Sequence, residues 1–200
     1  MNPIVFYFDF VSPYAYLASN LIDEVAQRHG RSVQWLPFRL GVTVVKVMGL
    51  KPILDTPLKA AYVRHDVARM AKASGLPLTE DISMFDPVPA QQVFYAAPVE
   101  SRGDLASALL RARWANGLNI SDIDVLTEIT HQNTGVSKRE IRQWVGSSDS
   151  REAVRNATNA AIARGVFGSP TFVVGAELFW GVDRLPLLDR YLINGESYGC

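Results

Sequence analysis

The segment that most constrains the fold is an apolar run that leads directly into a helix start near the N-terminus. Residues 4–8, IVFYF, are rich in β-forming side chains and predict a buried strand. Ser12 and Pro13 follow, and serine as N-cap before proline at the first helical position is typical of a helix start. The pattern predicts one helix to about His29 and a second strand over 33–38. Such a β-α-β opening favours a parallel strand pair with a right-handed crossover.

The rest of the chain divides into a long helical block and a short β-rich end. From about 56 to 165, only helical patterns occur. Residues 171–175 then predict a strand, and 176–180 can pair back on it as a hairpin. A last helix is expected over about 183–194, where leucines recur at helical spacing.

Several serines in the helical block stand at predicted helix starts. Ser121 and Ser150 are each expected to begin a helix that ends at a glycine. Ser137 and Glu140 have the spacing of a capping box, in which the two residues bond each other's backbone N–H groups. These positions divide the block into successive helices.

The order of the elements predicts an α/β protein in which a helical insertion interrupts one sheet. We expect residues 1–45 and 166–200 to form the sheet-bearing domain. Residues 46–165 are then the inserted helical domain.

Composition and charge exclude several classes of function. The formal net charge is zero, which gives no electrostatic basis for binding nucleic acid or an anionic membrane. No apolar run reaches the roughly 18 residues that span a bilayer, and the N-terminus lacks a secretory pattern, so we expect a cytoplasmic location. The single cysteine, Cys200, and the widely separated His29, His65 and His131 predict neither an internal disulfide nor a metal site.

The sequence Ser12-Pro13-Tyr14-Ala15 is the first candidate for chemistry. It follows a predicted strand, where ligands bind in open α/β sheets, and it opens a helix, whose N-terminus favours an anion. The hydroxyl of Ser12 can donate a hydrogen bond to a bound thiolate and so lower the pKa of that thiol. The alternative is that Ser12 acts only as a helix N-cap.

The segment Asp183-Arg184 is a candidate for binding the charged end of a ligand. Asp183 can accept a hydrogen bond from an ammonium group, and Arg184 can hold a carboxylate. Alternatively, Asp183 caps the last helix and Arg184 is solvated.

In the helical block, the polar residues of one segment are spaced three, four and three positions apart, which places them on one helix face. These residues are Lys59, Tyr62, Asp66 and Arg69. The alternative is an ordinary solvated face.

Together these segments resemble 2-hydroxychromene-2-carboxylate isomerases, which are relatives of kappa-class glutathione transferases. In thioredoxin-like disulfide oxidoreductases the first motif reads C-P-x-C, whereas here Ser12 and Ala15 replace both cysteines, so dithiol exchange lacks its thiols. The resemblance implies a thioredoxin-like domain of order β-α-β … β-β-α with a large all-helical insertion. It also implies a cis bond at Ser169-Pro170, where the backbone of Ser169 can pair with the peptide backbone of a ligand.

The resemblance further implies glutathione as the cofactor, a homodimer, and a small aromatic 2-oxo or 2-hydroxy acid as the substrate. It makes Ser12 the catalytic residue, which stabilises the glutathione thiolate. The residues implied to bind glutathione are Ser12, Ser169, Pro170, Gly181, Val182, Asp183 and Arg184. The residues implied to border the substrate are Tyr14, Lys46, Ile53, Leu54, Lys59 and Tyr62.

The reaction implied by the resemblance interconverts 2-hydroxychromene-2-carboxylate and trans-o-hydroxybenzylidenepyruvate, a step in naphthalene-type aromatic catabolism. A thiolate adds reversibly to the conjugated alkene, the resulting single bond rotates, and elimination gives the trans alkene. The substrate carboxylate needs a cation, for which Lys46, Lys51 and Lys59 are candidates.

The chain departs from the family pattern at positions where relatives often carry polar side chains. Val182 stands where the family often has asparagine or glutamine, and Ile53 and Leu54 stand at a turn where it often has asparagine. The stretch 85–92 lacks the asparagine and arginine that the family often has there. These departures affect contacts to glutathione or to the substrate.

Two other functions fit the same sequence. A kappa-type glutathione transferase uses the same glutathione site but consumes the thiol by conjugating an electrophile. A non-catalytic thioredoxin-like domain instead grips extended peptides at Ser169-Pro170. The Asp183-Arg184 pair argues against this second alternative, because it suits a small zwitterionic ligand.

Overall fold

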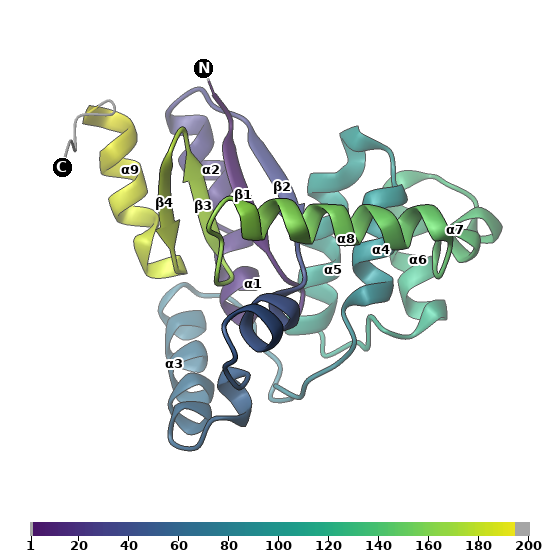
Figure 1. Cartoon of the computed structure of the whole chain (residues 1–200), viewed down its shortest axis with the longest axis horizontal. Helices are drawn as coiled ribbons and strands as arrows, with labels where there is room; N and C mark the ends of the chain where they lie inside the picture. Colours follow the sequence, from purple (N-terminus) through teal and green to yellow (C-terminus); the bar gives the residue numbers. More distant parts are fainter. Residues whose placement is uncertain (1, 195–200) are drawn as a thin grey trace.

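The computed structural model describes residues 2–194, and a four-stranded mixed sheet with the order β2-β1-β3-β4 lies at its centre (Figure 1). β1 (Ile4–Phe8) pairs in parallel with β2 (Val33–Pro37). β3 (Thr171–Val174) runs antiparallel to both β1 and β4 (Glu177–Trp180). The predicted parallel pair and the predicted hairpin are therefore confirmed.

The side chains of β1 alternate between the two faces of the sheet, as the period of a strand requires. Ile4, Phe6 and Phe8 are fully buried in the main apolar cluster. The ring of Phe6 lies 4.9 Å from that of Trp35 and 5.2 Å from that of Phe172, measured between centroids. Aromatic contacts across three neighbouring strands thus hold this face together.

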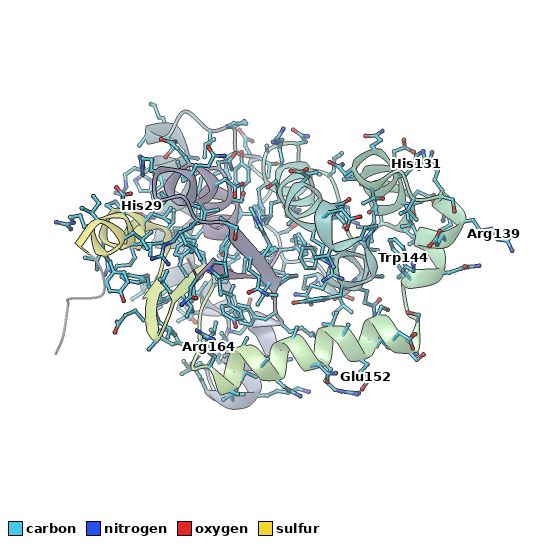
Figure 2. The ribbon with its side chains drawn as sticks, turned by 90° about the horizontal axis from the view of Figure 1, so that it is seen from above. His29, His131, Arg139, Trp144, Glu152 and Arg164 are labelled. Atoms are coloured by element: carbon cyan, nitrogen blue, oxygen red, sulfur yellow. The ribbon has the colours of Figure 1, made fainter. Side chains whose placement is uncertain are left out.

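The opposite face of the sheet is covered by the end of α8 (Ser148–Ala163), which crosses from the helical block to the sheet in Figure 1. Tyr7 of β1 packs there in a second apolar cluster with Ala161. Figure 2 shows Arg164 at this end of α8, where its guanidinium donates to the carbonyl of Gly175 at 2.6 Å. One long helix therefore connects the helical block to the hairpin.

Two helices, α1 (Pro13–Ser19) and α2 (Ile22–Arg28), replace the single helix that the sequence predicts after β1. The break has a local cause. The side chains of Ser19 and Asn20 both donate to the carbonyl of Tyr16, at 2.8 and 2.7 Å. Side-chain bonds of this kind compete with the regular helical ladder and end α1 at this point.

The segment after β2 forms two short elements that the sequence analysis did not anticipate. They are η1 (Val42–Val47), a π-helix, and η2 (Ile53–Asp55), a 3₁₀ turn. α3 (Lys59–Ala73) follows and lies below the sheet in Figure 1. The expected boundary between residues 45 and 46 falls inside η1, and the division into two domains stays a prediction.

The helical block extends to one side of the sheet (Figure 1). Before α8 it contains α4 (Val88–Ala96), η3 (Val99–Ser101), α5 (Arg102–Trp114), α6 (Ile123–Thr134) and α7 (Lys138–Trp144). The main apolar cluster continues from the sheet into this block through Leu105 and Leu126. Ser137 caps α7 as predicted, because its side chain accepts from the N–H of Glu140 at 3.3 Å.

Two predicted helix starts are displaced. α6 is capped by Asp122, one residue after the predicted Ser121. α8 is capped by Ser147 rather than Ser150. The hydroxyl of Ser150 is buried and donates to the carbonyl of Trp144 at 2.6 Å instead.

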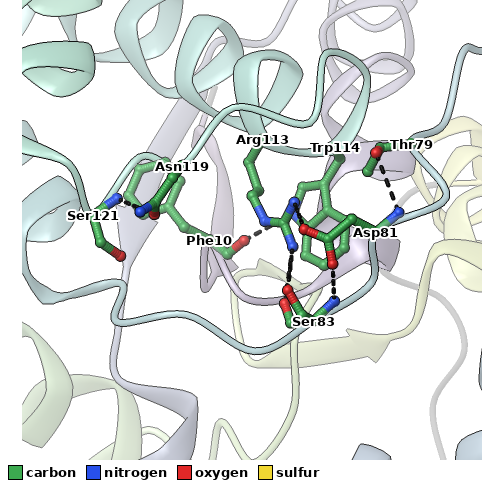
Figure 3. Close-up of polar contacts among 8 residues, drawn as sticks. All are labelled: Phe10, Thr79, Asp81, Ser83, Arg113, Trp114, Asn119 and Ser121. Atoms are coloured by element: carbon green, nitrogen blue, oxygen red, sulfur yellow. Dashed lines mark hydrogen bonds and ion pairs between the residues drawn. The ribbon is translucent and has the colours of Figure 1, made fainter.

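Two neighbouring residues of α5 bind the loop before α4 and the segment that follows β1 (Figure 3). Arg113 donates to the carbonyl of Ser83 at 2.9 Å, and its guanidinium lies 3.4 Å from the carboxylate of Asp81. The neighbouring Trp114 donates its indole N–H to the carbonyl of Phe10 at 2.8 Å. These contacts position the chain just before the first candidate motif.

The chain ends, within the described residues, with the 3₁₀ turn η4 (Val182–Arg184) and the helix α9 (Leu185–Asn194). Within residues 2–194, no helix combines the length and apolar character that a membrane span needs.

Candidate functional site

A cavity of about 810 Å³ opens beside the residues that follow β1. Its walls come from the start of α1, the η1–η2 segment, one face of α3, the loop before β3, and the β4–η4 connection. The predicted site residues that line it are Ser12, Tyr14, Lys51, Ile53, Leu54, Lys59, Tyr62, Ser169, Pro170, Gly181, Val182, Asp183 and Arg184.

Lys46 is outside the described lining of this cavity. It is exposed on η1, which turns Val44 rather than Lys46 toward the cavity. The two other lysines that the sequence offered for a carboxylate, Lys51 and Lys59, do line it.

Ser12 is the N-cap of α1, and it also faces the loop before β3. Its Oγ accepts from the N–H of Ala15 at 3.2 Å, while its backbone N–H donates to the carbonyl of Asp9 at 3.0 Å. Its O–H donates to the carbonyl of Ser169 at 3.0 Å. The capping role and a chemical role are therefore compatible, because the lone pair serves the cap and the hydrogen points across the site.

The loop before β3 is fixed from two sides. The Ser169–Pro170 bond is cis, as predicted. The Oγ of Ser169 accepts from the backbone N–H of Asp9 at 2.9 Å, and the carbonyl of Pro170 accepts from the N–H of Gly181 at 2.9 Å. These bonds bring Ser12, Ser169 and Gly181 to one side of the cavity.

Asp183 and Arg184 follow Gly181 at the rim of the cavity. Asp183 does not cap α9 but lies in the turn η4, where it accepts a hydrogen bond from Arg184 at 2.8 Å. Both side chains are about half exposed, which leaves their outer faces accessible. Gly181 has φ of 108°, a backbone conformation that residues with a side chain rarely adopt, so this turn favours glycine.

The polar face of α3 converges on Asp66. Tyr62 donates to its carboxylate at 3.4 Å, and Arg69 forms an ion pair with it, as the spacing predicts. Tyr14 of α1 donates to the same carboxylate at 2.9 Å, a contact that the sequence analysis missed. No periodicity signals this contact, because Tyr14 and Asp66 belong to different helices.

The contacts around Asp66 set the charge of this part of the cavity. Burial raises the pKa of Asp66, but hydrogen bonds from Arg69, Tyr14 and Tyr62 outweigh it and hold the pKa below its ordinary value. Burial, and then the hydrogen bond to Asp66, raises the pKa of Tyr14 well above its ordinary value. At neutral pH the cavity therefore contains the Asp66 anion and the neutral phenol of Tyr14.

Two aromatic side chains for which the sequence predicts no role in binding lie at the rim of the cavity. Phe167 and Trp180 are 42% and 54% exposed, and their ring centroids lie 4.8 Å apart. A Cβ on Gly168, which follows Phe167, would stand 2.1 Å from Nε1 of Trp180, so glycine permits Trp180 to lie here. The sequence offered one signal for this feature, which is that the aromatic residue Trp180 directly precedes Gly181 of the candidate binding segment.

Much of the remaining lining is apolar and was also missed, because half of these residues come from the irregular η1–η2 segment. Its residues outside the predicted set are Leu40, Val44, Met48, Leu50, Met70 and Met84. Leu50 and Ile53 are more than half exposed. Exposed apolar side chains around a concave site are typical of a site for an apolar or aromatic group.

The described residues offer no metal centre. Among residues 2–194, no group of three histidine, cysteine or acidic side chains could hold an ion. Figure 2 shows His29 and His131 at opposite sides of the molecule. Cys200, which the sequence analysis expected to remain unpaired, lies outside the described residues.

A family model described as a DSBA-like thioredoxin domain matches residues 3–193. The chain belongs to this family. The Ser12-Pro13-Tyr14-Ala15 motif shows that this DSBA-like thioredoxin domain lacks the cysteine pair that dithiol exchange needs.

Named relatives refine the similarity. The chain is 28% identical to a 2-hydroxychromene-2-carboxylate isomerase of Pseudomonas sp. (strain C18), over 96% of this chain and 92% of that protein. It is 36% identical to glutathione S-transferase kappa 1 of Caenorhabditis elegans, over 38% of this chain and 34% of that protein. A solved structure of a 2-hydroxychromene-2-carboxylate isomerase matches with a TM-score of 0.86 and 26% identity, covering 96% of this chain and 95% of that chain. The resemblance inferred from the sequence is confirmed.

Proposed function

We propose that this protein is a glutathione-dependent isomerase that interconverts 2-hydroxychromene-2-carboxylate and trans-o-hydroxybenzylidenepyruvate. The observation that carries the proposal is that the hydroxyl of Ser12, the Ser169 backbone and the Asp183–Arg184 pair border one cavity. The isomerase relative and the glutathione transferase relative support the reaction and the cofactor.

The groups around the cavity fit glutathione by their chemistry. A thiolate needs a donor, which Ser12 offers, and a peptide N–H needs an acceptor, which the Ser169 carbonyl offers. A γ-glutamyl end carries an ammonium and a carboxylate, which suit Asp183 and Arg184. In this structure, Ser12 bonds to the Ser169 carbonyl and Arg184 bonds to Asp183. Binding of glutathione would therefore replace these hydrogen bonds with bonds to the ligand.

In the proposed mechanism, glutathione supplies the nucleophilic thiol when it is bound. Ser12 turns its hydroxyl hydrogen from the Ser169 carbonyl to the sulfur and keeps the proton on Oγ. A hydrogen bond to a charged group contributes about 1.5–3 kcal/mol, which lowers a thiol pKa of about 8.5 by one to two units. Ser12 therefore acts as a donor that favours the thiolate, and it is not a base.

The remaining walls suit an aromatic acid. The ammonium groups of Lys51 and Lys59 can attract the substrate carboxylate. The aromatic ring of the substrate can contact Phe167, Trp180 and the apolar residues that line the cavity. Tyr14, held by Asp66, presents a neutral phenol to the same space.

A kappa-type glutathione transferase is the second candidate function, and the match to the Caenorhabditis elegans protein favours it. Both functions use the same glutathione residues and differ only in whether the thiol is returned. The homodimer and the role in aromatic catabolism stay predictions of the resemblance, and the cytoplasmic location stays a prediction from the sequence.

The test is to incubate the pure protein with glutathione and 2-hydroxychromene-2-carboxylate while following product absorbance and free thiol together. We expect the absorbance to change at constant thiol, with no change when glutathione is omitted. Loss of thiol would instead establish the transferase, and product formation without glutathione would contradict both.

Non-catalytic peptide binding predicts no turnover together with capture of extended peptides.

Ser12→Ala is the informative variant in the turnover assay with glutathione and 2-hydroxychromene-2-carboxylate. Ser147→Ala is its matched control, because it removes the N-cap of a helix outside the cavity lining.

A further inference from the structure

Asp9, at the end of β1, is a carboxylate with only 1% of its surface exposed. Its Oδ1 accepts from the backbone N–H of Val11 at 3.3 Å and from the side-chain amide of Gln91 at 3.1 Å. Its Oδ2 accepts from the backbone N–H of Leu40 at 2.8 Å. Its own backbone N–H donates to Oγ of Ser169 at 2.9 Å.

Three of these four partners belong to segments that line the cavity. Val11 precedes the first motif, Leu40 leads into η1, and Ser169 forms the loop before β3. The three segments are far apart in the sequence, and Asp9 bonds to each of them. Asp9 is thus a common anchor behind three walls of the candidate site.

The groups that surround Asp9 fit the ionised carboxylate. Each bond to its oxygens comes from an N–H donor. The amide nitrogen of Gln91 also donates to the carbonyl of Phe38 at 3.0 Å, and its Oε1 is buried without a partner among the described residues. Inverting this amide would direct Oε1 at two oxygens, so the carboxylate and the carbonyl together fix its orientation.

The charge of Asp9 is finely balanced at neutral pH. Its pKa is raised to about 7, because burial outweighs the hydrogen bonds from Leu40 and Val11, the positive charge of Arg39 and the hydrogen bond from Gln91, all of which lower it. Among the described residues, Arg39 is the charged side chain that acts on this carboxylate. Protonation would neutralise the carboxylate and so weaken the three charge-assisted N–H bonds that it accepts.

We propose that Asp9 is a positioning residue: its ionised carboxylate holds Val11 and Leu40 in place while its backbone N–H holds Ser169, so that protonation of the carboxylate weakens ligand binding in the cavity. The inference deepens the proposed function and rests on it for the identity of the ligand, glutathione. Asp9 does not line the cavity among its described residues, so it acts through its partners.

The test measures two quantities from pH 5.5 to 7.5. One is the affinity for S-methylglutathione, a probe without an ionisable thiol, and the other is the NMR shift of the Val11 and Leu40 amide protons. We expect both to titrate with one midpoint, and the affinity to fall at least about fivefold at the acid end, the lower range of coupling between sites. In Asp9→Asn both titrations should vanish.

Gln91→Leu gives a readout that a purely structural role would not move. It removes a hydrogen bond that lowers the pKa of Asp9, so the common midpoint should shift to higher pH. Thr158→Val is the matched control, because it removes the acceptor of the Arg39 N–H, at 3.1 Å, beside the same loop without touching Asp9. Its midpoint should equal that of the wild type.

The outcomes separate the inference from the proposed function. Amide shifts that do not titrate, a titration that persists in Asp9→Asn, or an affinity that stays flat while the amides titrate would each overturn the role of Asp9. A wild type that binds no probe at any pH would contradict the proposed glutathione site, and the amide titration would still decide whether Asp9 holds its partners. If Asp9→Asn does not fold, the midpoint of Gln91→Leu decides the question.

Discussion

The hydroxyl of Ser12 donates to the carbonyl of Ser169 at 3.0 Å, although 157 positions separate the two residues. This bond joins the start of α1 to the loop before β3. It also fixes the direction in which the Ser12 hydrogen points before any ligand arrives. A bound thiolate therefore competes with a carbonyl for a donor that is already oriented, and the stronger, charged acceptor is favoured.

We expect Ser12→Ala to lower turnover by at least about tenfold, because one hydrogen bond to a thiolate is lost, about 1.5–3 kcal/mol. The loss of the N-cap also costs about 1 kcal/mol of stability, which urea unfolding measures separately. Ser137→Ala removes an equivalent cap from α7 and should leave turnover unchanged. Turnover near that of the wild type in Ser12→Ala would remove Ser12 from the mechanism.

Tyr14→Phe should lower the free energy of unfolding by about 1–2 kcal/mol, since the phenol loses a 2.9 Å hydrogen bond to the Asp66 carboxylate between α1 and α3. Tyr62→Phe is the matched control, because Tyr62 is exposed and its bond to the same carboxylate measures 3.4 Å. Urea unfolding of both variants is the measurement. Equal effects of the two substitutions would contradict a specific link through Tyr14.

Arg113→Leu should destabilise the fold by about 2–4 kcal/mol, because a buried guanidinium loses its bond to the Ser83 carbonyl and its contacts with the rings of Phe85 and Trp114. The ion pair to Asp81 contributes little, since that carboxylate is more than half exposed. Asp81→Asn should therefore change the unfolding midpoint only slightly. A midpoint of Arg113→Leu equal to that of Asp81→Asn would refute this account of the loop anchor.

Asp9 should give stability a recognisable pH dependence. Its pKa is about 7 in the folded protein and 3.8 is its ordinary value, so between these values the folded state binds a proton that the unfolded state releases. The contribution of Asp9 to the free energy of unfolding is fully present below pH 3.8, the ordinary pKa. It is lost as the pH rises through the folded-state pKa of about 7. Relative to Asp9→Asn, the wild type should therefore become less stable from about pH 4 to pH 7 and show no further relative change above pH 8. Parallel curves for the two proteins would contradict the raised pKa.

The parts of the fold that the sequence predicts are those with local signals. The apolar run of β1, the Ser12-Pro13 helix start and the serine cap of α7 each depend on neighbours within a few residues. The order of strands and helices follows from such signals once the handedness of a β-α-β unit is known. The same local signals fail where side chains compete for the backbone, as Ser19 and Asn20 do at the end of α1.

The parts of the site that the sequence misses depend on contacts between distant segments. Asp66 appears on one helix face, but nothing local shows that Tyr14 reaches it. Asp9 resembles any acidic residue after a strand until the fold buries it between Leu40 and Gln91. Tertiary packing sets burial, and burial sets the pKa, so the chemistry of these groups is readable only from the structure.

The central claim is that Ser12 lowers the pKa of the glutathione thiol, and the most direct measurement is the ultraviolet absorbance of the thiolate in the complex as a function of pH. In the wild-type complex the midpoint should lie at least about one unit below the free-thiol value of about 8.5. In Ser12→Ala it should return toward that value. A midpoint near 8.5 in the wild type, or the same lowered midpoint in both proteins, would contradict the account.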